Sequence, residues 1–295
     1  MSALPLLAVP NVSEGRDRRS IDAIAAAFTA EDQARLLDVH ADLDHHRAVV
    51  SLVGWPGALA GALLAGAAEA ARRIDLGAER GAHPHVGALD VVPVVYLQEA
   101  ARGAACAEAL LAAHRIGSEL EVPVLLYGEL AGGRTRAELR RGGVRGLGEQ
   151  LRRGELLVDF GPRVPHPTAG VTLVAARPPL VAFNLELAAP AGVQDARRIA
   201  SLIREGGPEG LPGLRAIGIA LQRADGPVAQ VSMNVERPAQ LALAEVVAAV
   251  ARHARPARAE LVGLAPRAAL ERFPPDLPMP GFDPARHVIE NALGL

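Results

Sequence analysis

The chain has 295 residues, of which 50% are hydrophobic and 3% aromatic, so it is long enough and apolar enough to bury a sizeable core. Its formal net charge of −2 argues against a nucleic-acid-binding protein that relies on bulk positive charge. The longest stretch rich in Ala and Leu, residues 58–71, is too short and too rich in small residues to span a membrane. We therefore expect neither a nucleic-acid partner nor a membrane partner. We expect a cytoplasmic protein, because no leader with a charged and then an apolar region is visible.

Two features of composition restrict the chemistry. The single cysteine, Cys106, excludes an internal disulfide and is expected to be a small core residue on a helix. All 31 basic residues are arginine. Recognition of a carboxylate must therefore use guanidinium groups, and Schiff-base chemistry by lysine is excluded.

The hydrophobic pattern of the first part of the chain predicts the order strand, helix, strand, strand, helix, strand. The strands are expected at residues 4–9, 35–39, 48–53 and 91–97, and the helices at residues 18–28 and 57–74. Residues 41–46 join the second and third strands with a length suited to an antiparallel hairpin. This order is the split βαβ unit of ferredoxin-like folds.

Further elements follow before a proline pair that predicts a domain boundary. A helix is expected at residues 98–120 and strands at 122–127 and 171–176. Between them lie a Gly- and Arg-rich stretch at 134–150, which is either partly helical or a loop, an extended segment at 156–160 and a proline-rich loop at 162–167. Pro178 and Pro179 then break the chain, which predicts the domains 1–178 and 179–295.

The second domain is expected to repeat the order of the first. Its strands are predicted at residues 180–187, 214–221, 228–235 and 259–264, and its helices at 193–205 and 239–252. Asp225-Gly226 indicates a turn between the two middle strands. The tail, residues 266–295, has a helical pattern in two pieces around a proline-rich linker. We therefore expect an α/β (α+β) fold of two successive βαββαβ ferredoxin-like subdomains.

Histidines are concentrated near two of the predicted strands. His83 and His85 lie just before the fourth strand, in the sequence Gly81-Ala82-His83-Pro84-His85-Val86-Gly87-Ala88-Leu89-Asp90, and His40, His45 and His46 occur at the hairpin. Imidazole takes up and releases a proton near neutral pH, so these residues are candidates for acid–base catalysis. Pro84 favours an extended conformation at His83 and would fix the direction of its ring. The alternative is a polar loop with surface histidines.

A metal-dependent hydrolase is a second alternative. His83 and His85 would point the same way on an extended segment, and a zinc site could be completed by His40, Asp44, His45 and His46. The helix-borne and strand-borne ligand motifs of known zinc enzymes are missing, and we therefore expect no bound metal.

A series of short motifs runs through both halves of the chain and is specific as a set, although each motif alone is weak. The motifs are Val9-Pro10-Asn11-Val12-Ser13-Glu14-Gly15, the histidine motif at 81–90, residues 123–128, Asp159-Phe160-Gly161-Pro162, Ala182-Phe183-Asn184, Val231-Ser232-Met233-Asn234 and residues 260–264. In order and spacing they resemble the glutamate formiminotransferases, the folate-dependent enzymes of histidine breakdown. The resemblance extends to about residue 272, and it is to the single-function bacterial form without a cyclodeaminase domain.

The resemblance implies an activity and a set of site residues. The implied reaction moves the formimino group of N-formimino-L-glutamate to N5 of tetrahydrofolate, the co-substrate, in a cytoplasmic homodimer without a metal. The catalytic histidine falls on His83, and Asn11, Arg47 and His85 fall at substrate-binding positions. The implied folate-contacting loop consists of Gly161, Pro162, Arg163, Val164, Pro165, His166, Pro167, Thr168, Ala169 and Gly170.

Some residues depart from the family pattern. His40 stands where animal members have an aspartate that is a proposed partner of the catalytic histidine, and Asp38, Asp42 or Asp44 could supply the missing charge. His85 stands where an arginine is expected, and Ala169 stands where a tryptophan packs in the folate loop. A non-catalytic folate-binding paralogue and formyl transfer from N-formylglutamate therefore stay open as alternatives.

Overall fold

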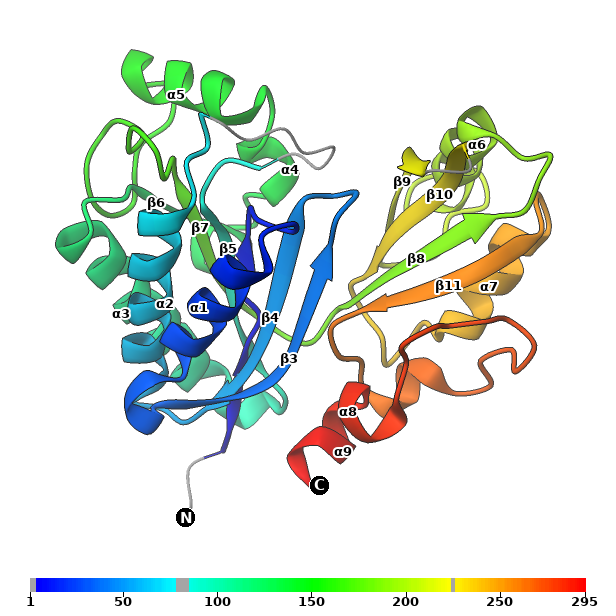
Figure 1. Cartoon of the computed structure of the whole chain (residues 1–295), viewed down its shortest axis with the longest axis horizontal. Coiled ribbons are helices and arrows are strands. Elements are labelled where there is room, and N and C mark those ends of the chain that lie inside the picture. Colours follow the sequence, from blue (N-terminus) through cyan, green and yellow to red (C-terminus); the bar gives the residue numbers. More distant parts are fainter. Residues whose placement is uncertain (1–3, 78–84, 224–225) are drawn as a thin grey trace. The chain divides into compact units, whose positions relative to one another are not determined.

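The computed structural model describes residues 4–77, 85–223 and 226–295. The chain divides into two compact units, Met1–Pro178 and Pro179–Leu295, which Figure 1 colours from blue to green and from yellow-green to red. Each unit has its own sheet and its own hydrophobic core. Among the described residues, none of the helices combines the length and the apolar character needed to cross a membrane.

The first unit is built on a sheet whose opening strands have the ferredoxin-like order. Strands β1 (Leu6–Ala8) and β2 (Asn11–Val12) lie in one line between β4 (Arg47–Gly54) and β5 (Leu89–Tyr96), and β3 (Ala34–Asp42) pairs with the other side of β4. All these pairings are antiparallel. The predicted split βαβ unit is confirmed, and the expected hairpin joins β3 to β4.

Two parallel strands extend this sheet beyond β5. Strand β7 (Thr172–Arg177) pairs with β5, and β6 (Val124–Leu126) pairs with β7. Helices α1 (Arg18–Phe28), α2 (Leu59–Arg73) and α3 (Arg102–Glu119) contribute to the core on one face. The Gly- and Arg-rich stretch forms α4 (Arg136–Leu139) and α5 (Gly143–Arg153), whose leucines pack with β5, β6 and β7 in a separate core cluster. Short 3-10 helices occur at Ala30–Asp32, Glu99–Ala101 and Gly128–Ala131.

The packing of α1 on α2 shows how the sequence specifies this core. Asp17 caps α1 by accepting a hydrogen bond from the backbone of Arg19, and Ile21, Ile24 and Phe28 are buried along one face. A Cβ atom added to Gly66 of α2 would lie 2.1 Å from the Phe28 ring, so the ring fits only over a glycine. Burial of a side chain such as Phe28 contributes about 1.5–3 kcal/mol to stability.

The second unit repeats the ferredoxin-like order on its own. Strands β8 (Val181–Leu187), β9 (Leu214–Arg223), β10 (Gly226–Val235) and β11 (Pro256–Val262) form an antiparallel sheet in the order β11-β8-β10-β9. Helices α6 (Val193–Ile203) and α7 (Leu243–Ala251) contribute to its core. The tail contains a 3-10 helix (Arg267–Leu270), α8 (Pro284–His287) and α9 (Ile289–Leu293). Phe273 of the tail packs edge-on against Phe183 at the centre of β8.

Candidate active site

The predicted catalytic segment is described only from His85 onward, and His83 lies outside the described residues. The histidine motif ends at Asp90, whose side chain is fully buried at the start of β5. Its Oδ1 atom accepts a 2.8 Å hydrogen bond from the backbone N–H of Val86. This bond closes the chain back on itself over four residues, so Asp90 fixes the position of the backbone that follows His85.

Two arginines from distant parts of the chain meet the same carboxylate. Arg47 Nη2 donates a 2.5 Å hydrogen bond to Asp90 Oδ2, and Arg140 Nη2 contacts that oxygen as well. The side chains of Arg47 and Arg140 are only 15% and 12% exposed. Burial and repulsion by Arg140 lower the pKa of Arg47 to about 10, although Asp90 opposes the shift. Arg47 therefore remains charged at neutral pH.

The sheet register brings the hairpin and the histidine motif to the same end of the first unit. Val12 of β2 is opposite Ala48 of β4 on one side and opposite Leu89 of β5 on the other. Arg47 directly precedes Ala48, and Asp90 directly follows Leu89 at an irregularity in the pairing of β2 with β5. The sequence alone does not predict that the hairpin and the histidine motif lie at the same end of the sheet, because this depends on which strands pair. Asn11, a predicted substrate-binding residue, lies on β2, where its side-chain Nδ2 donates a 2.9 Å hydrogen bond to Val9 O.

The opening motif of the chain also contacts this end of the sheet. Ser13 Oγ donates a 2.7 Å hydrogen bond to Gly87 O, and Ser13 N donates to Ala88 O at 2.9 Å. Gly15 lies so close to the hairpin that a Cβ atom there would be 2.1 Å from Asp42 O. Residues 9–15 therefore pack between the hairpin and the histidine motif.

The predicted folate loop, residues 161–170, is fixed to the same segment. His166 and Gly170 exchange two backbone hydrogen bonds of 2.9 and 3.0 Å, which makes the end of the loop a small hairpin. Ala88 N donates to Ala169 O at 2.9 Å, and Val171 N donates to Val86 O at 2.8 Å. Residues 86–88 thus pair with the end of the loop.

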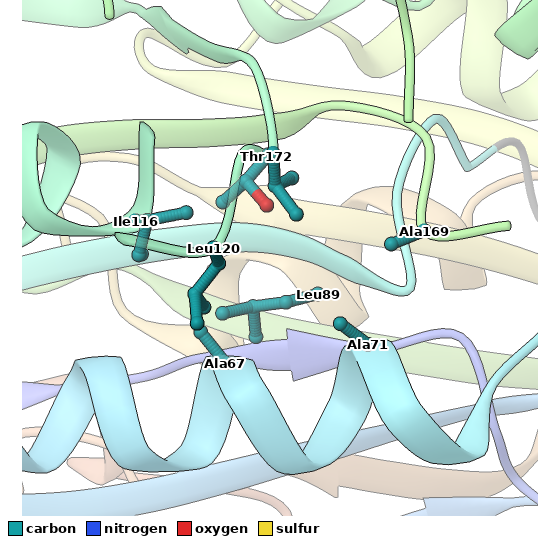
Figure 2. Close-up of a pocket in the computed structure, with 8 residues that line it drawn as sticks. Ala67, Ala71, Leu89, Ile116, Leu120, Ala169 and Thr172 are labelled. Atoms are coloured by element: carbon teal, nitrogen blue, oxygen red, sulfur yellow. The ribbon is translucent and has the colours of Figure 1, made fainter. Parts of the chain in front are cut away.

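Ala169 is a core residue of the first unit. Its side chain is 2% exposed and lines a small cavity, shown in Figure 2, together with residues of α2, α3 and β5. The cavity is lined by Ala67, Ala71, Leu89, Ile116, Leu120, Val122, Ala169 and Thr172, and its volume is about 10 Å³. Such a space holds about one water molecule at most. The position where the resemblance expects a tryptophan therefore faces the protein core in this chain.

Asp42, a predicted catalytic residue, is engaged within the hairpin. Its Oδ1 atom accepts hydrogen bonds from the backbone N–H groups of Asp44 and His45 at 2.8 and 2.9 Å, and its Oδ2 contacts His45 Nδ1. Burial raises the pKa of Asp42, but these donors outweigh it and lower the pKa to about 2. Asp42 therefore orients the ring of His45. His40 is half-buried on β3, opposite Val49 of β4.

His46 has a structural role at the turn of the hairpin. Its backbone is left-handed, with φ of 51°, and its Nδ1 atom accepts a 2.9 Å hydrogen bond from Gly15 N. Burial lowers the pKa of His46, repulsion by Arg16 and His85 lowers it further, and Glu14 opposes the shift. The neutral ring is therefore favoured, with Nδ1 as the acceptor.

Sequence reasoning did not assign roles to Ser13, Asp90 or Arg140. Ser13 lies inside the opening motif and Asp90 inside the histidine motif, so their positions in these motifs could have indicated a role at the site. Arg140 lies in the Gly- and Arg-rich stretch among several other arginines, and its distance of 50 residues from Asp90 matches no local spacing rule.

Comparison with known proteins gives one family. Residues 6–177 match the formiminotransferase domain, N-terminal subdomain. The chain is 34% identical over 297 residues to the glutamate formimidoyltransferase of Streptococcus pyogenes serotype M1, covering 97% of both chains. It is 35% identical over 272 residues to the glutamate formimidoyltransferase of Thermoplasma acidophilum, covering 89% of this chain and 88% of the relative. It is 36% identical to the formimidoyltransferase-cyclodeaminase of Rattus norvegicus, covering 89% of this chain and 50% of the relative.

Proposed function

The chain belongs to the formiminotransferase family, and from this premise we propose that it is a glutamate formimidoyltransferase. It transfers the formimino group of N-formimino-L-glutamate to N5 of tetrahydrofolate, and the products are 5-formiminotetrahydrofolate and L-glutamate. Tetrahydrofolate is a co-substrate, and the reaction is a step of histidine degradation.

The observation that carries this proposal is the meeting of three segments at one end of the first sheet. The hairpin contributes Arg47, the histidine motif contributes Asp90, and the end of the loop at residues 161–170, with Val171 after it, pairs with Val86 and Ala88. A donor with carboxylates, a folate and an acid–base histidine must all meet in such a reaction. The arrangement supports a site in which these three segments cooperate.

The chemistry requires two proton movements. Attack of N5 on the formimino carbon forms a tetrahedral intermediate, and one proton must leave N5 while another must reach the departing nitrogen of glutamate. We assign both transfers to His83, because one imidazole can accept and then return a proton, for a contribution of about 10²–10⁴-fold. Asn11, Arg47, His85 and the loop at 161–170 are assigned to binding. His40 and Asp42 are assigned to supporting the proton transfer, Asp42 through the ring of His45 that it orients.

The hydrolase alternative needs the hairpin histidines as metal ligands. His46 Nδ1 accepts a hydrogen bond from Gly15 N, which places the proton of the neutral ring on Nε2, so neither nitrogen of His46 offers a lone pair to a metal in this arrangement. We propose that the enzyme acts without a metal, as a homodimer in the cytoplasm. Activity retained after treatment with a chelator, and a mass by light scattering near twice that of the chain, are the expected results.

The test of the reaction is turnover by the purified protein. N-formimino-L-glutamate and tetrahydrofolate are supplied, and 5-formiminotetrahydrofolate and glutamate are quantified by chromatography and mass spectrometry. N-formyl-L-glutamate serves as a matched second donor, which distinguishes formimino from formyl transfer. Binding of tetrahydrofolate without turnover of either donor would identify a non-catalytic paralogue and overturn the proposal.

A further inference from the structure

Two arginines from distant parts of the chain contact the buried carboxylate of Asp90. Arg47 and Arg140 both contact Asp90 Oδ2, so two guanidinium groups share one negative charge. Arg136 lies one helical turn before Arg140 and is close enough to repel Arg47 electrostatically. Its guanidinium carbon lies 5.7 Å from the centre of the Tyr127 ring. The cationic cluster is defined as Arg47, Arg136 and Arg140: two of these guanidinium groups contact Asp90, and the third is close enough to repel Arg47.

Acidic side chains near the cluster are engaged elsewhere. Glu138 of α4 accepts hydrogen bonds from the backbone and the hydroxyl of Thr135, which caps the helix. Asp159 contacts Arg134 and accepts a hydrogen bond from Leu126 N. Arg47 and Arg140 are both in ion-pair contact with Asp90. The cluster is expected to attract an anion.

Two donors on this side of the sheet are buried without a hydrogen-bond acceptor among the described residues. They are Arg140 Nε and the hydroxyl of Tyr127, whose residue is 6% exposed. A buried donor that lacks an acceptor costs about 1–3 kcal/mol, so it is normally matched by water or by a ligand. Both atoms belong to the surroundings of α4, because Arg136 covers the Tyr127 ring and Arg140 directly follows the helix. Each of these two donors therefore lacks a hydrogen-bond acceptor among the described residues.

We propose that Arg140, together with Arg136, binds a carboxylate of the glutamate moiety that the substrates carry. The inference rests on the proposed function and deepens it by naming the residues of α4 that recognise this group. Asp90 holds Arg47 and Arg140 in place, and the Nε–H of Arg140, which has no acceptor among the described residues, meets the carboxylate. Planar guanidinium suits this task better than an ammonium group, because its fork pairs with both carboxylate oxygens.

Both substrates contain glutamate, so the test must distinguish the formimino donor from the folate. Arg140→Lys keeps the charge but loses the fork, and Arg140→Gln removes the charge. Each is compared with wild type for the KM of N-formimino-L-glutamate, of tetrahydrofolate, and of tetrahydropteroate, which lacks glutamate. Arg145→Gln is the matched control, because Arg145 is an exposed arginine on the neighbouring helix α5.

We expect the KM of one substrate to rise at least about tenfold in Arg140→Lys and further in Arg140→Gln, with kcat changed much less. A rise for the formimino donor assigns the cluster to that donor. A rise for tetrahydrofolate that disappears with tetrahydropteroate assigns it to the folate tail. Unchanged KM values for every substrate in both variants, with wild-type turnover intact, overturn the inference while leaving the proposed function standing.

A direct measurement separates binding from turnover. Titration calorimetry with L-glutamate, the reaction product, and with tetrahydrofolate is carried out on wild type, Arg140→Gln and Arg145→Gln. Weaker binding of one ligand in Arg140→Gln alone supports the inference even if no turnover is found. Circular dichroism and the melting temperature identify a variant that has failed to fold. In that case Arg136→Gln, which leaves the contacts of Asp90 in place, carries the same test with the same expected loss.

Discussion

Ser13 and Gly87, 74 residues apart in the sequence, are joined by a buried hydrogen bond of 2.7 Å from the Ser13 hydroxyl to the Gly87 carbonyl. The bond connects the opening motif of the chain to the histidine motif. Because the neighbouring Ala88 pairs with Ala169, this contact links two of the motifs that carry the family resemblance to the predicted folate loop.

Replacement of Ser13 by alanine is expected to lower the free energy of unfolding by about 1–2 kcal/mol, because the buried Gly87 carbonyl loses its partner. Urea unfolding followed by circular dichroism measures the change. Ser118→Ala is the matched control, since Ser118 makes an exposed hydrogen bond within α3. An equal loss in both variants would contradict a special role for the Ser13 bond.

A side chain at Gly87 is expected to separate the loop at 161–170 from the histidine motif. A Cβ atom there would lie 2.2 Å from Val171 O, and backbone atoms cannot move aside as a flexible side chain can. Gly87→Ala should destabilise the protein by about 1–3 kcal/mol and raise the KM of tetrahydrofolate. Gly103→Ala, where nothing lies within 4 Å, should leave both properties near those of wild type. Wild-type folate kinetics in Gly87→Ala would show that this pairing does not position the loop.

Much of the fold could be predicted because apolar periodicity is a local signal. The spacing of Ile21, Ile24 and Phe28 predicted α1, and all three side chains are buried. Ends of elements were less predictable. The strand expected at residues 35–39 continues to Asp42, because backbone pairing with Arg47 extends it through polar residues. Pairing depends on the partner strand, which the local pattern does not contain.

The candidate site was predictable in its motifs but not in its contacts. The hairpin and the histidine motif were recognised, yet their approach depends on β2 lying between β4 and β5. The contact between Arg140 and Asp90 also requires the Gly- and Arg-rich stretch to fold as α4, with Leu139 buried. Glycine-rich sequence argues against helix by propensity, and tertiary packing of a few leucines overrides it.

The pH dependence of stability should report His46. Its pKa is lowered in the folded state, chiefly by burial, so below about pH 6.5 the unfolded state binds protons that the folded state does not. Stability is therefore lost as the pH falls through this range. His46→Asn keeps an acceptor for Gly15 N and tolerates a left-handed backbone, but it cannot be protonated. The free energy of unfolding of His46→Asn minus that of wild type should therefore increase as the pH falls from about 7 to about 5. A constant difference would contradict the assignment.

The assignment of the proton transfers to His83 has a kinetic consequence. His83→Ala should lower kcat by at least about 10²-fold, while tetrahydrofolate binding and the melting temperature stay close to those of wild type. The wild-type pH–rate profile should contain an ionisation between about pH 6 and 8, and the residual activity of His83→Ala should lack it. Steady-state kinetics across pH, with folate binding measured by calorimetry, checks both points.

His85→Ala is the matched control for this prediction, because it removes a second histidine from the same motif. A binding residue should raise a KM when it is removed, whereas a residue that moves protons should lower kcat and remove an ionisation from the pH–rate profile. His85→Ala is therefore expected to keep the ionisation that His83→Ala loses. If His85→Ala or His40→Ala abolishes turnover and His83→Ala does not, the reaction can stand but the proton must travel through a different histidine. The hairpin, where Asp42 orients His45, would then be the place to look for the histidine that transfers the proton.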